Sequence, residues 1–280
     1  MAAPKEPQRL KPSSPWNIHY ADDSCRMVRS FGEGDDQVIL IADRFEPDDA
    51  LEISFIGKRF PTGPYGGRAQ LRFGPREAEQ ERGFYTMTMD DSTPAIMLRG
   101  DVRLAPPGKA EMAAYERASG MKRYGFEWSK VAPEQEAAAT FIEVRNAAHA
   151  PFLLETGSLG APMKALRQCA DDLPTLWGID VAKHAGLSRK PIPKTSPRGW
   201  IGYPPKMAEQ GRSAVVHYRL DVDATGAPTD CHIQQSTRPE EFDRAVCRGI
   251  MRWATFEPAL DAEGNPVASY YVSAVYFRIS

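Results

Sequence analysis

The sequence has no run of about 18 apolar residues, the length that an α-helix needs to cross a bilayer. We therefore expect no membrane span in this chain. It also has little net charge: 35 Lys and Arg face 37 Asp and Glu, giving a formal charge of −2. Because no overall field attracts polyanions, we expect no nucleic-acid partner. Apolar residues make up 42% of the 280 residues and charged residues 26%, which indicates a folded protein long enough for two domains.

A signal peptide is missing from the N-terminus, where Met-Ala-Ala-Pro-Lys lacks a basic and then apolar pattern. Residues 1–15 are instead polar and rich in proline, which predicts a disordered segment. Two interpretations stay open. Either the protein is cytosolic, or a signal peptide has been removed and a Met placed before the mature start.

Cysteines are few, and their spacing gives no C-x-x-C and no close Cys/His cluster. Cys231 and Cys247 flank a predicted strand–helix unit. A disulfide between them would close a short loop and stabilise the fold by about 3 kcal/mol. The alternative is two free cysteines that act as small buried apolar side chains. We expect the disulfide, and with it an oxidising compartment.

Catalytic and phosphate-binding motifs are also lacking. Residues 157–160 (GSLG) do not form G-x-S-x-G, and Ser158 is better interpreted as a helix cap. Residues 32–34 (GEG) are followed by two acids that would repel phosphate. We therefore expect no catalytic residues, no cofactor and no enzymatic activity, although catalytic residues scattered through a fold escape a motif search.

Metal-binding signals are weak. His217 and His232 lie on predicted paired strands, but a metal needs more ligands, and we interpret both as exposed strand positions. Residues 221–226 resemble the start of an EF-hand loop, yet His232 stands where the final Glu ligand belongs. We interpret this segment as a hairpin turn and the other Asp pairs as turns and caps. No metal site is expected.

What the sequence does contain is a series of short apolar runs between Asp- and Gly-rich turns, over residues 16–182. This pattern predicts a mostly-β domain, either a sandwich or a barrel, within a protein of the α+β class. The strands are expected at residues 16–20, 38–41, 51–56, 69–73, 84–89, 95–104 and 140–145. One helix follows Ser158, with Met163, Leu166 and Leu173 at helical spacing and Gly178 at its end. A second short helix is expected at residues 109–118.

A basic, proline-rich stretch at residues 183–199 predicts a semi-extended linker between two domains. Contact with an anionic surface is the alternative to a solvated connector. Its charged and proline residues are Lys183, Arg189, Lys190, Pro191, Pro193, Lys194, Pro197 and Arg198.

Residues 200–280 form a more regular pattern. A short helical turn is expected at residues 206–210. Next come an alternating strand at residues 216–222, a hairpin turn and a second strand at residues 228–235. The helix that follows has Phe242, Val246, Ile250 and Trp253 on one face, and a last strand covers residues 268–279. The predicted order is helix–strand–strand–helix–strand.

This region resembles the C-terminal domain of the TonB family. The resemblance covers less than a third of the chain and rests on an ordered set of residues: Tyr203-Pro204, Gly226, Ser236, the segment WATFEP at residues 253–258, Gly264 and Phe277. It implies that the last strand lies at a sheet edge. In the family this edge pairs with the Ton box, an extended segment of an outer-membrane transporter, because an edge strand presents unpaired N–H and C=O groups.

The resemblance places the partner-binding residues on the last strand, with Tyr203 and Pro204 near the contact. Two alternatives are that this strand forms a homodimer, or that the N-terminal domain covers it; Tyr203 and Pro204 would then have only structural roles. The strand residues are Ala268, Ser269, Tyr270, Tyr271, Val272, Ser273, Ala274, Val275, Tyr276 and Phe277.

The energy-transducing members of the family carry an N-terminal membrane anchor and a long proline-rich spacer, which are not found here. We therefore expect a periplasmic adaptor that binds a protein partner, such as a transporter. The alternatives are an energy transducer whose anchor has been removed, and a secreted enzyme or inhibitor. The N-terminal domain resembles extra domains of related periplasmic proteins through residues 25–29 and through Cys169, Leu173 and Trp177, which implies a disulfide between Cys25 and Cys169.

Overall fold

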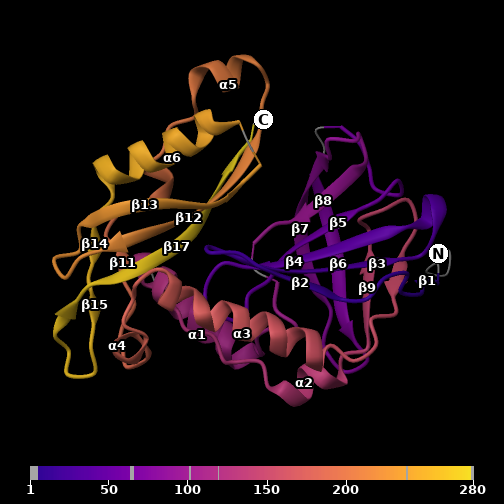
Figure 1. The fold of residues 1–280 in the computed structure, drawn as a ribbon, viewed down its shortest axis with the longest axis horizontal. Helices are drawn as coiled ribbons and strands as arrows, with labels where there is room; N and C mark the ends of the chain where they lie inside the picture. The colour runs from indigo at the N-terminus through magenta and orange to yellow at the C-terminus, as the bar shows by residue number, and fades with distance from the viewer. Residues whose placement is uncertain (1–5, 64–65, 101, 119, 238, 279–280) are drawn as a thin grey trace. The chain divides into compact units, whose positions relative to one another are not determined.

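A computed structural model describes residues 6–63, 66–100, 102–118, 120–237 and 239–278 (Figure 1). The chain forms two compact units, each assembled from two stretches. The first unit consists of Met1–Pro107 and Ser129–Asp172, and the second of Gly108–Trp128 and Leu173–Ser280. Among the described residues, no helix is long and apolar enough to span a membrane.

The first unit is built on one strongly curved sheet of ten strands, in the order β1-β10-β9-β6-β7-β8-β5-β4-β3-β2 (Figure 1). All neighbouring strands are antiparallel except β1 and β10. The strands are β1 (Gln8–Leu10), β2 (Asn17–Tyr20), β3 (Cys25–Phe31), β4 (Val38–Arg44), β5 (Glu52–Ile56), β6 (Gly66–Gly74), β7 (Gln80–Thr88), β8 (Pro94–Leu98), β9 (Phe141–Arg145) and β10 (Phe152–Leu154). The predicted α+β class with a mostly-β N-terminal region is confirmed.

The N-terminal segment joins the two edges of this sheet. Its first strand, β1, pairs with β10, and β2 pairs with β3. Between them, Ser13 N–H donates to Ser30 O at 2.9 Å, and Gly32 N–H donates to Lys11 O at 2.8 Å. The sheet therefore closes into a barrel-like arrangement. Residues 8–15 are ordered by these contacts where the sequence predicts disorder, while residues 1–5 lie outside the described part of the chain.

Two helices accompany the sheet, α2 (Pro133–Ala138) and α3 (Gly160–Leu176). The apolar stripe predicted for α3 is buried at Met163, Leu166 and Leu173. The disulfide implied by the resemblance is confirmed, and it ties Cys25 of β3 to Cys169 of α3.

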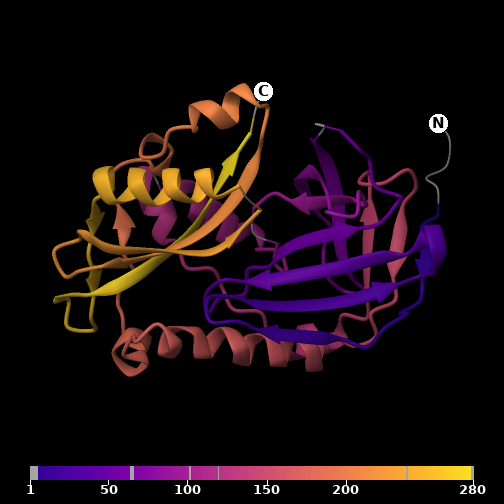
Figure 2. The ribbon, with the colours of Figure 1, turned by 45° about the horizontal axis from the view of Figure 1, so that its top comes forward.

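The second unit contains a three-stranded antiparallel sheet in the order β13-β12-β17, with α6 packed across one face (Figure 2). The αββαβ order predicted for this region is confirmed as α5-β12-β13-α6-β17. The elements are α1 (Lys109–Arg117), η2 (Gly120–Gly125), α4 (Val181–Ala185), β11 (Ile192–Pro193), η3 (Pro197–Gly199), α5 (Pro205–Glu209), β12 (Ala214–Val222), β13 (Pro228–Ser236), α6 (Glu240–Trp253), β14 (Phe256–Glu257), β15 (Ala259–Leu260), β16 (Pro266–Val267) and β17 (Ser269–Phe277).

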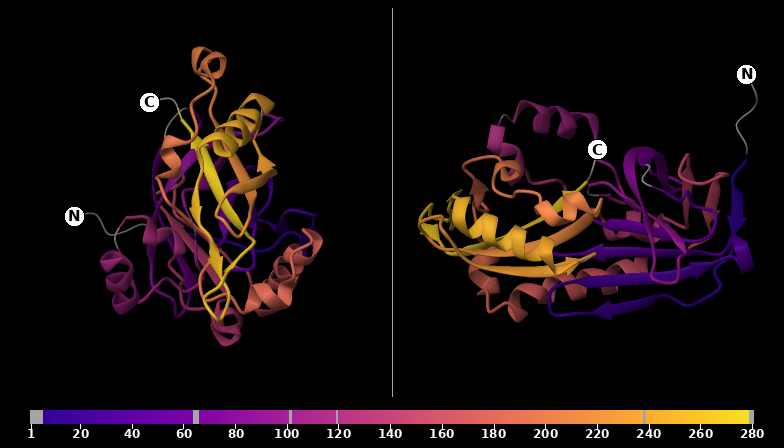
Figure 3. Two further views of the ribbon diagram at one scale, coloured as in Figure 1. Left: turned by 90° about the vertical axis from the view of Figure 1, so that its left-hand side faces the viewer. Right: turned by 90° about the horizontal axis from the view of Figure 1, so that it is seen from above.

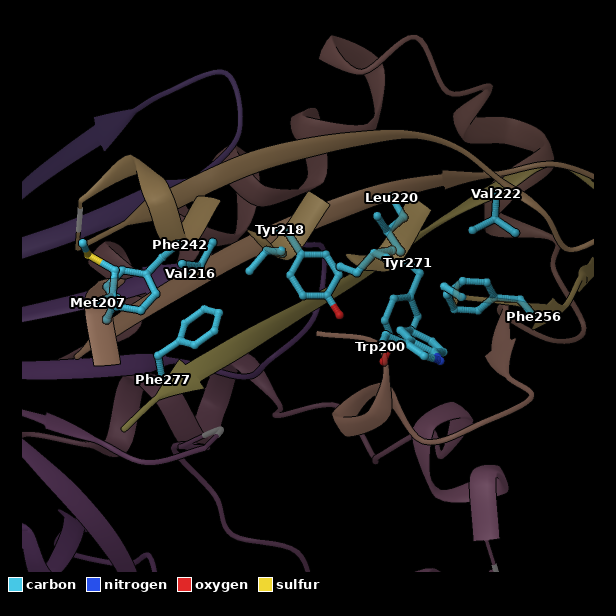
Figure 4. Close-up of a cluster of buried hydrophobic side chains, with 14 residues drawn as sticks. Trp200, Met207, Val216, Tyr218, Leu220, Val222, Phe242, Phe256, Tyr271 and Phe277 are labelled. Carbon is cyan, nitrogen blue, oxygen red and sulfur yellow. The ribbon is translucent and has the colours of Figure 1, made fainter. Parts of the chain in front are cut away.

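One apolar cluster fills the space between this sheet and α6 (Figure 4). The alternating positions of β12 that the sequence assigns to the core are all buried, and so are Phe242, Val246 and Ile250 of α6. Trp253, which was expected on the same face, is 58% exposed at the C-terminal end of α6. At one end of the cluster, the rings of Trp200 and Phe256 lie 5.5 Å apart. This apolar burial holds α6 against the sheet.

The proline-rich stretch at residues 183–199 is partly built into the second unit. Strand β11 pairs with β14, and Lys194 N–H donates to Thr255 O at 2.8 Å. The guanidinium of Arg189 lies 2.9 Å from a carboxylate oxygen of Glu257.

Candidate protein-interaction edge

Strand β17 forms one edge of the three-stranded sheet of the second unit. Its nine residues pair with β12 without a break, from Ser269 opposite Val222 to Phe277 opposite Ala214. In the sheet order β13-β12-β17, its other side pairs with no further strand among the residues that the structure describes (Figure 3). A strand in this position can accept one more strand through its outward-pointing backbone groups.

The side chains of β17 alternate between the two faces of the sheet. Tyr271 and Phe277 point into the core, where Tyr271 lies 5.0 Å from the ring of Phe256 and Phe277 lies 4.6 Å from that of Phe242 (Figure 4). These aromatic contacts hold both ends of the strand, so β17 is positioned before any partner arrives.

The two edges of the sheet differ in their chemistry. Strand β17 reads SYYVSAVYF, with no charge, no proline and no register shift. Strand β13 begins with Pro228, contains Asp230, and has two register shifts against β12. Charges, prolines and bulges are the features that protect edge strands from further pairing. Strand β17 has none of these three protective features, whereas β13 has all three.

Tyr203 lies beside the C-terminal end of β17. Its ring is 5.4 Å from that of Phe277 and 5.7 Å from that of Phe242, and its hydroxyl donates to the carbonyl oxygen of Arg212. Burial raises the pKa of Tyr203. Pro204 precedes the first turn of α5. Both residues thus have structural contacts, and Tyr203 also touches the candidate edge.

The N-terminal third of β17 is covered. Ser269, Tyr270 and Tyr271 are buried, and Ala268 precedes the strand. The ring of His184 stacks on Tyr270 at 4.6 Å, and its Nε2 lies 2.9 Å from the hydroxyl of Ser269. Residues 272–276, by contrast, are only partly buried. The accessible part of the edge is therefore its second half.

His184 and Trp177 are contacts that sequence reasoning did not assign to this edge. Trp177 has its ring 5.0 Å from that of Tyr270 and carries the guanidinium of Arg219 4.6 Å above it. From the sequence, Trp177 was assigned to the helix that follows Ser158 and to the pattern shared with related periplasmic proteins, not to this edge. No motif signals such a contact, because the residues lie far from β17 in the sequence.

One interpretation of the histidines is wrong. His217 was expected to be exposed, but it is only 6% exposed, and Arg219, the next residue on the same face of β12, is 4% exposed. His232 is half-buried and lies near two carboxylates.

The hairpin interpretation of residues 221–226 is confirmed. Asp223 accepts hydrogen bonds from the N–H groups of Thr225, at 2.8 Å, and Ala227, at 3.0 Å. Hydrogen bonds from the Thr225 side chain and from these backbone groups lower the pKa of Asp223. Its carboxylate thus stabilises the hairpin turn by accepting backbone hydrogen bonds, as expected for Asp in this position.

The predicted disulfide between Cys231 and Cys247 is also confirmed. It joins β13 to α6, with Cα atoms 5.6 Å apart. It anchors the strand at the sheet edge opposite β17.

A helix–strand–strand–helix–strand unit whose last strand forms a clean sheet edge defines a small protein-interaction domain. Residues 201–279 match the family of the Gram-negative bacterial TonB protein C-terminal domain, so the resemblance predicted from the sequence is confirmed. This family is a non-enzymatic protein-interaction domain of the cell envelope. A comparison with curated proteins finds no match for the chain.

Proposed function

We propose that this protein is a periplasmic adaptor, not an enzyme, and that β17 binds an extended peptide segment of a protein partner by strand addition. The partner proposed here is an outer-membrane transporter that offers a Ton box. The single observation that carries the proposal is the nine-residue edge strand, uncharged and unbroken in register. Its lack of protective features favours pairing with another strand.

The second half of β17 is the proposed contact. Residues 272–276 are partly exposed, whereas Ser269 and Tyr270 are already covered by His184. We propose that the backbone of residues 272–276 makes the hydrogen bonds, and that Tyr203 and Phe277 support the end of the peptide. Main-chain hydrogen bonds then supply affinity, and side chains on alternate positions supply specificity.

The proposed periplasmic location is supported by the two disulfides, Cys25–Cys169 and Cys231–Cys247. Disulfides persist in oxidising compartments such as the bacterial periplasm, and they are rare in reducing ones.

Hydrogen exchange on the whole protein, with and without synthetic Ton-box peptides, tests the proposal. We expect added protection at residues 272–276 and little change in β13, which is the matched edge of the same sheet. Protection elsewhere only, or no change with any peptide, would refute strand addition at β17.

N-methylated peptides give a sharper control. In a paired strand, only alternate N–H groups point toward the neighbour. Methylating one alternate set should therefore abolish binding, while methylating the other set should leave it nearly unchanged. Equal effects of the two sets would contradict strand addition. Light scattering over a range of protein concentrations separates peptide binding from a homodimer formed through β17, which would protect residues 272–276 without peptide.

A further inference from the structure

Three side chains with metal-ligand chemistry converge on the sheet face opposite α6. Asp221 on β12 pairs directly with Asp230 on β13, and His232 follows two residues later on the same face. The Nε2 atom of His232 lies 3.1 Å from Oδ2 of Asp221 and 3.5 Å from Oδ2 of Asp230. All three ligand atoms lie within 4.8 Å of one another.

These separations match the spacing of ligands around a small divalent cation. Atoms bound at about 2.0–2.1 Å from zinc lie about 3.3 Å apart in a tetrahedral site and about 2.9 Å apart in an octahedral one. The observed 3.1 and 3.5 Å require only small movements of the carboxylates. The ligand atoms are thus already grouped as a cation would hold them.

Each carboxylate is held through its other oxygen. Oδ1 of Asp230 accepts the N–H of Cys231 at 2.7 Å, and Cys231 is fixed by its disulfide. Oδ1 of Asp221 lies 3.4 Å from Nη1 of Arg219, whose guanidinium is placed over Trp177. Contacts of this kind orient metal ligands. Oδ2 of Asp221 forms a hydrogen bond with Nε2 of His232 at 3.1 Å, and a bound cation would replace this hydrogen bond.

The charge and exposure of the cluster also suit a cation. Two carboxylates outweigh the single guanidinium of Arg219, and a neutral imidazole adds no charge. The side chains of Asp221 and His232 are about one third exposed, and that of Asp230 is 66% exposed, so water can complete the coordination. One imidazole with two carboxylates favours zinc and related transition metals over calcium or magnesium.

We infer that Asp221, Asp230 and His232 form a binding site for a divalent transition-metal ion of the zinc type, independent of the peptide edge. The chain supplies three ligands and solvent supplies the rest. The alternative is that these side chains hold no metal and that the hydrogen bond between His232 and Asp221 is their only function.

Calorimetric titration of the whole, chelator-treated protein with zinc chloride tests the inference. We expect one zinc ion per chain, with calcium and magnesium chloride binding at least about tenfold more weakly. Replacing His232→Ala or Asp230→Asn should weaken zinc binding by about tenfold or more. His19→Ala, which removes an exposed histidine on β2, is the matched control and should leave binding unchanged.

Cobalt provides a second readout, because its visible spectrum reports its ligands. Cobalt bound to the native protein should show a spectrum that is lost in the His232→Ala variant. Circular dichroism shows whether each variant is folded. The inference is overturned if folded native protein binds no zinc, or if His232→Ala and Asp230→Asn bind it as tightly as the native chain.

Discussion

At the scale of single residues, Gly226 explains why one position of the TonB-like pattern must be glycine. It occupies the hairpin turn with φ of 87°, a conformation that other residues rarely adopt. Its carbonyl oxygen accepts the N–H of Phe256 at 2.9 Å, and a Cβ atom at this position would overlap the carbonyl oxygen of Phe256. The turn thus packs directly on the chain that leaves α6.

Gly226→Ala is therefore expected to destabilise the second unit by more than backbone strain alone. Gly264→Ala is the matched control, since Gly264 has a similar φ of 84° but no atom within 4 Å of the added Cβ. We expect the control to cost about 1–3 kcal/mol and Gly226→Ala to cost clearly more. Urea unfolding measures both, and equal losses would show that the contact with Phe256 relaxes freely.

At the scale of elements, the sequence located those helices and strands that bury one face, because their apolar residues recur at the period of the element. Strand β12 and helix α6 each place apolar residues at the period of their structure, and both were found near their observed bounds. Strand β3 was missed because its polar residues have partners that the sequence does not reveal. Arg26 forms a two-fold ion pair with Asp43, and Arg29 lies over Trp16 at 5.1 Å.

The candidate edge followed the same rule. The family resemblance identified the last strand as the candidate edge. It did not predict that the first third of this strand is covered, because the covering residue, His184, stacks on Tyr270 from another element. Likewise, the alternation of β12 predicted one exposed face, yet Arg219 is only 4% exposed. A polar residue with partners in tertiary structure cannot be told from a solvated one by periodicity.

The disulfide between β13 and α6 gives a prediction at this scale. Replacing Cys231 and Cys247 together by Ala should destabilise the second unit by about 3 kcal/mol, as the chain-entropy estimate gives for a loop of this length. Thermal unfolding measures the loss. Peptide binding at β17 should survive below the new midpoint, because the bond lies on the opposite edge. Loss of peptide binding by the folded variant would contradict this separation.

At the scale of the whole molecule, the sequence order and the units do not coincide. The chain leaves the first unit after Pro107, contributes Gly108–Trp128 to the second unit, and returns at Ser129. The second stretch of the second unit begins at Leu173, before the region that matches the TonB family. Elements outside the family match therefore belong to the same compact unit.

A fragment of residues 173–280 should accordingly be more stable than one of residues 200–280. The shorter fragment loses the pairing of β11 with β14, the ion pair of Arg189 with Glu257, and the stacking of His184 on Tyr270. We expect a difference of about 1–2 kcal/mol, where each kcal/mol corresponds to about 4–8 °C for a domain of this size. Calorimetry measures the melting temperatures of the two fragments. Identical melting temperatures would show that these contacts do not stabilise the fragment.

Closure of the curved sheet has a consequence for how the chain reaches its fold. Gln8 pairs with Phe152, 144 positions later in the sequence (152 − 8), and Cys25 forms its disulfide with Cys169 across the same separation. Contacts between such distant positions raise the contact order and slow folding. When a ribosome or a translocase delivers the chain from its N-terminal side, β1 emerges well before β10, the strand with which it pairs. Strand β1 and Cys25 therefore reach their native contacts only after residues 152–169 have been delivered.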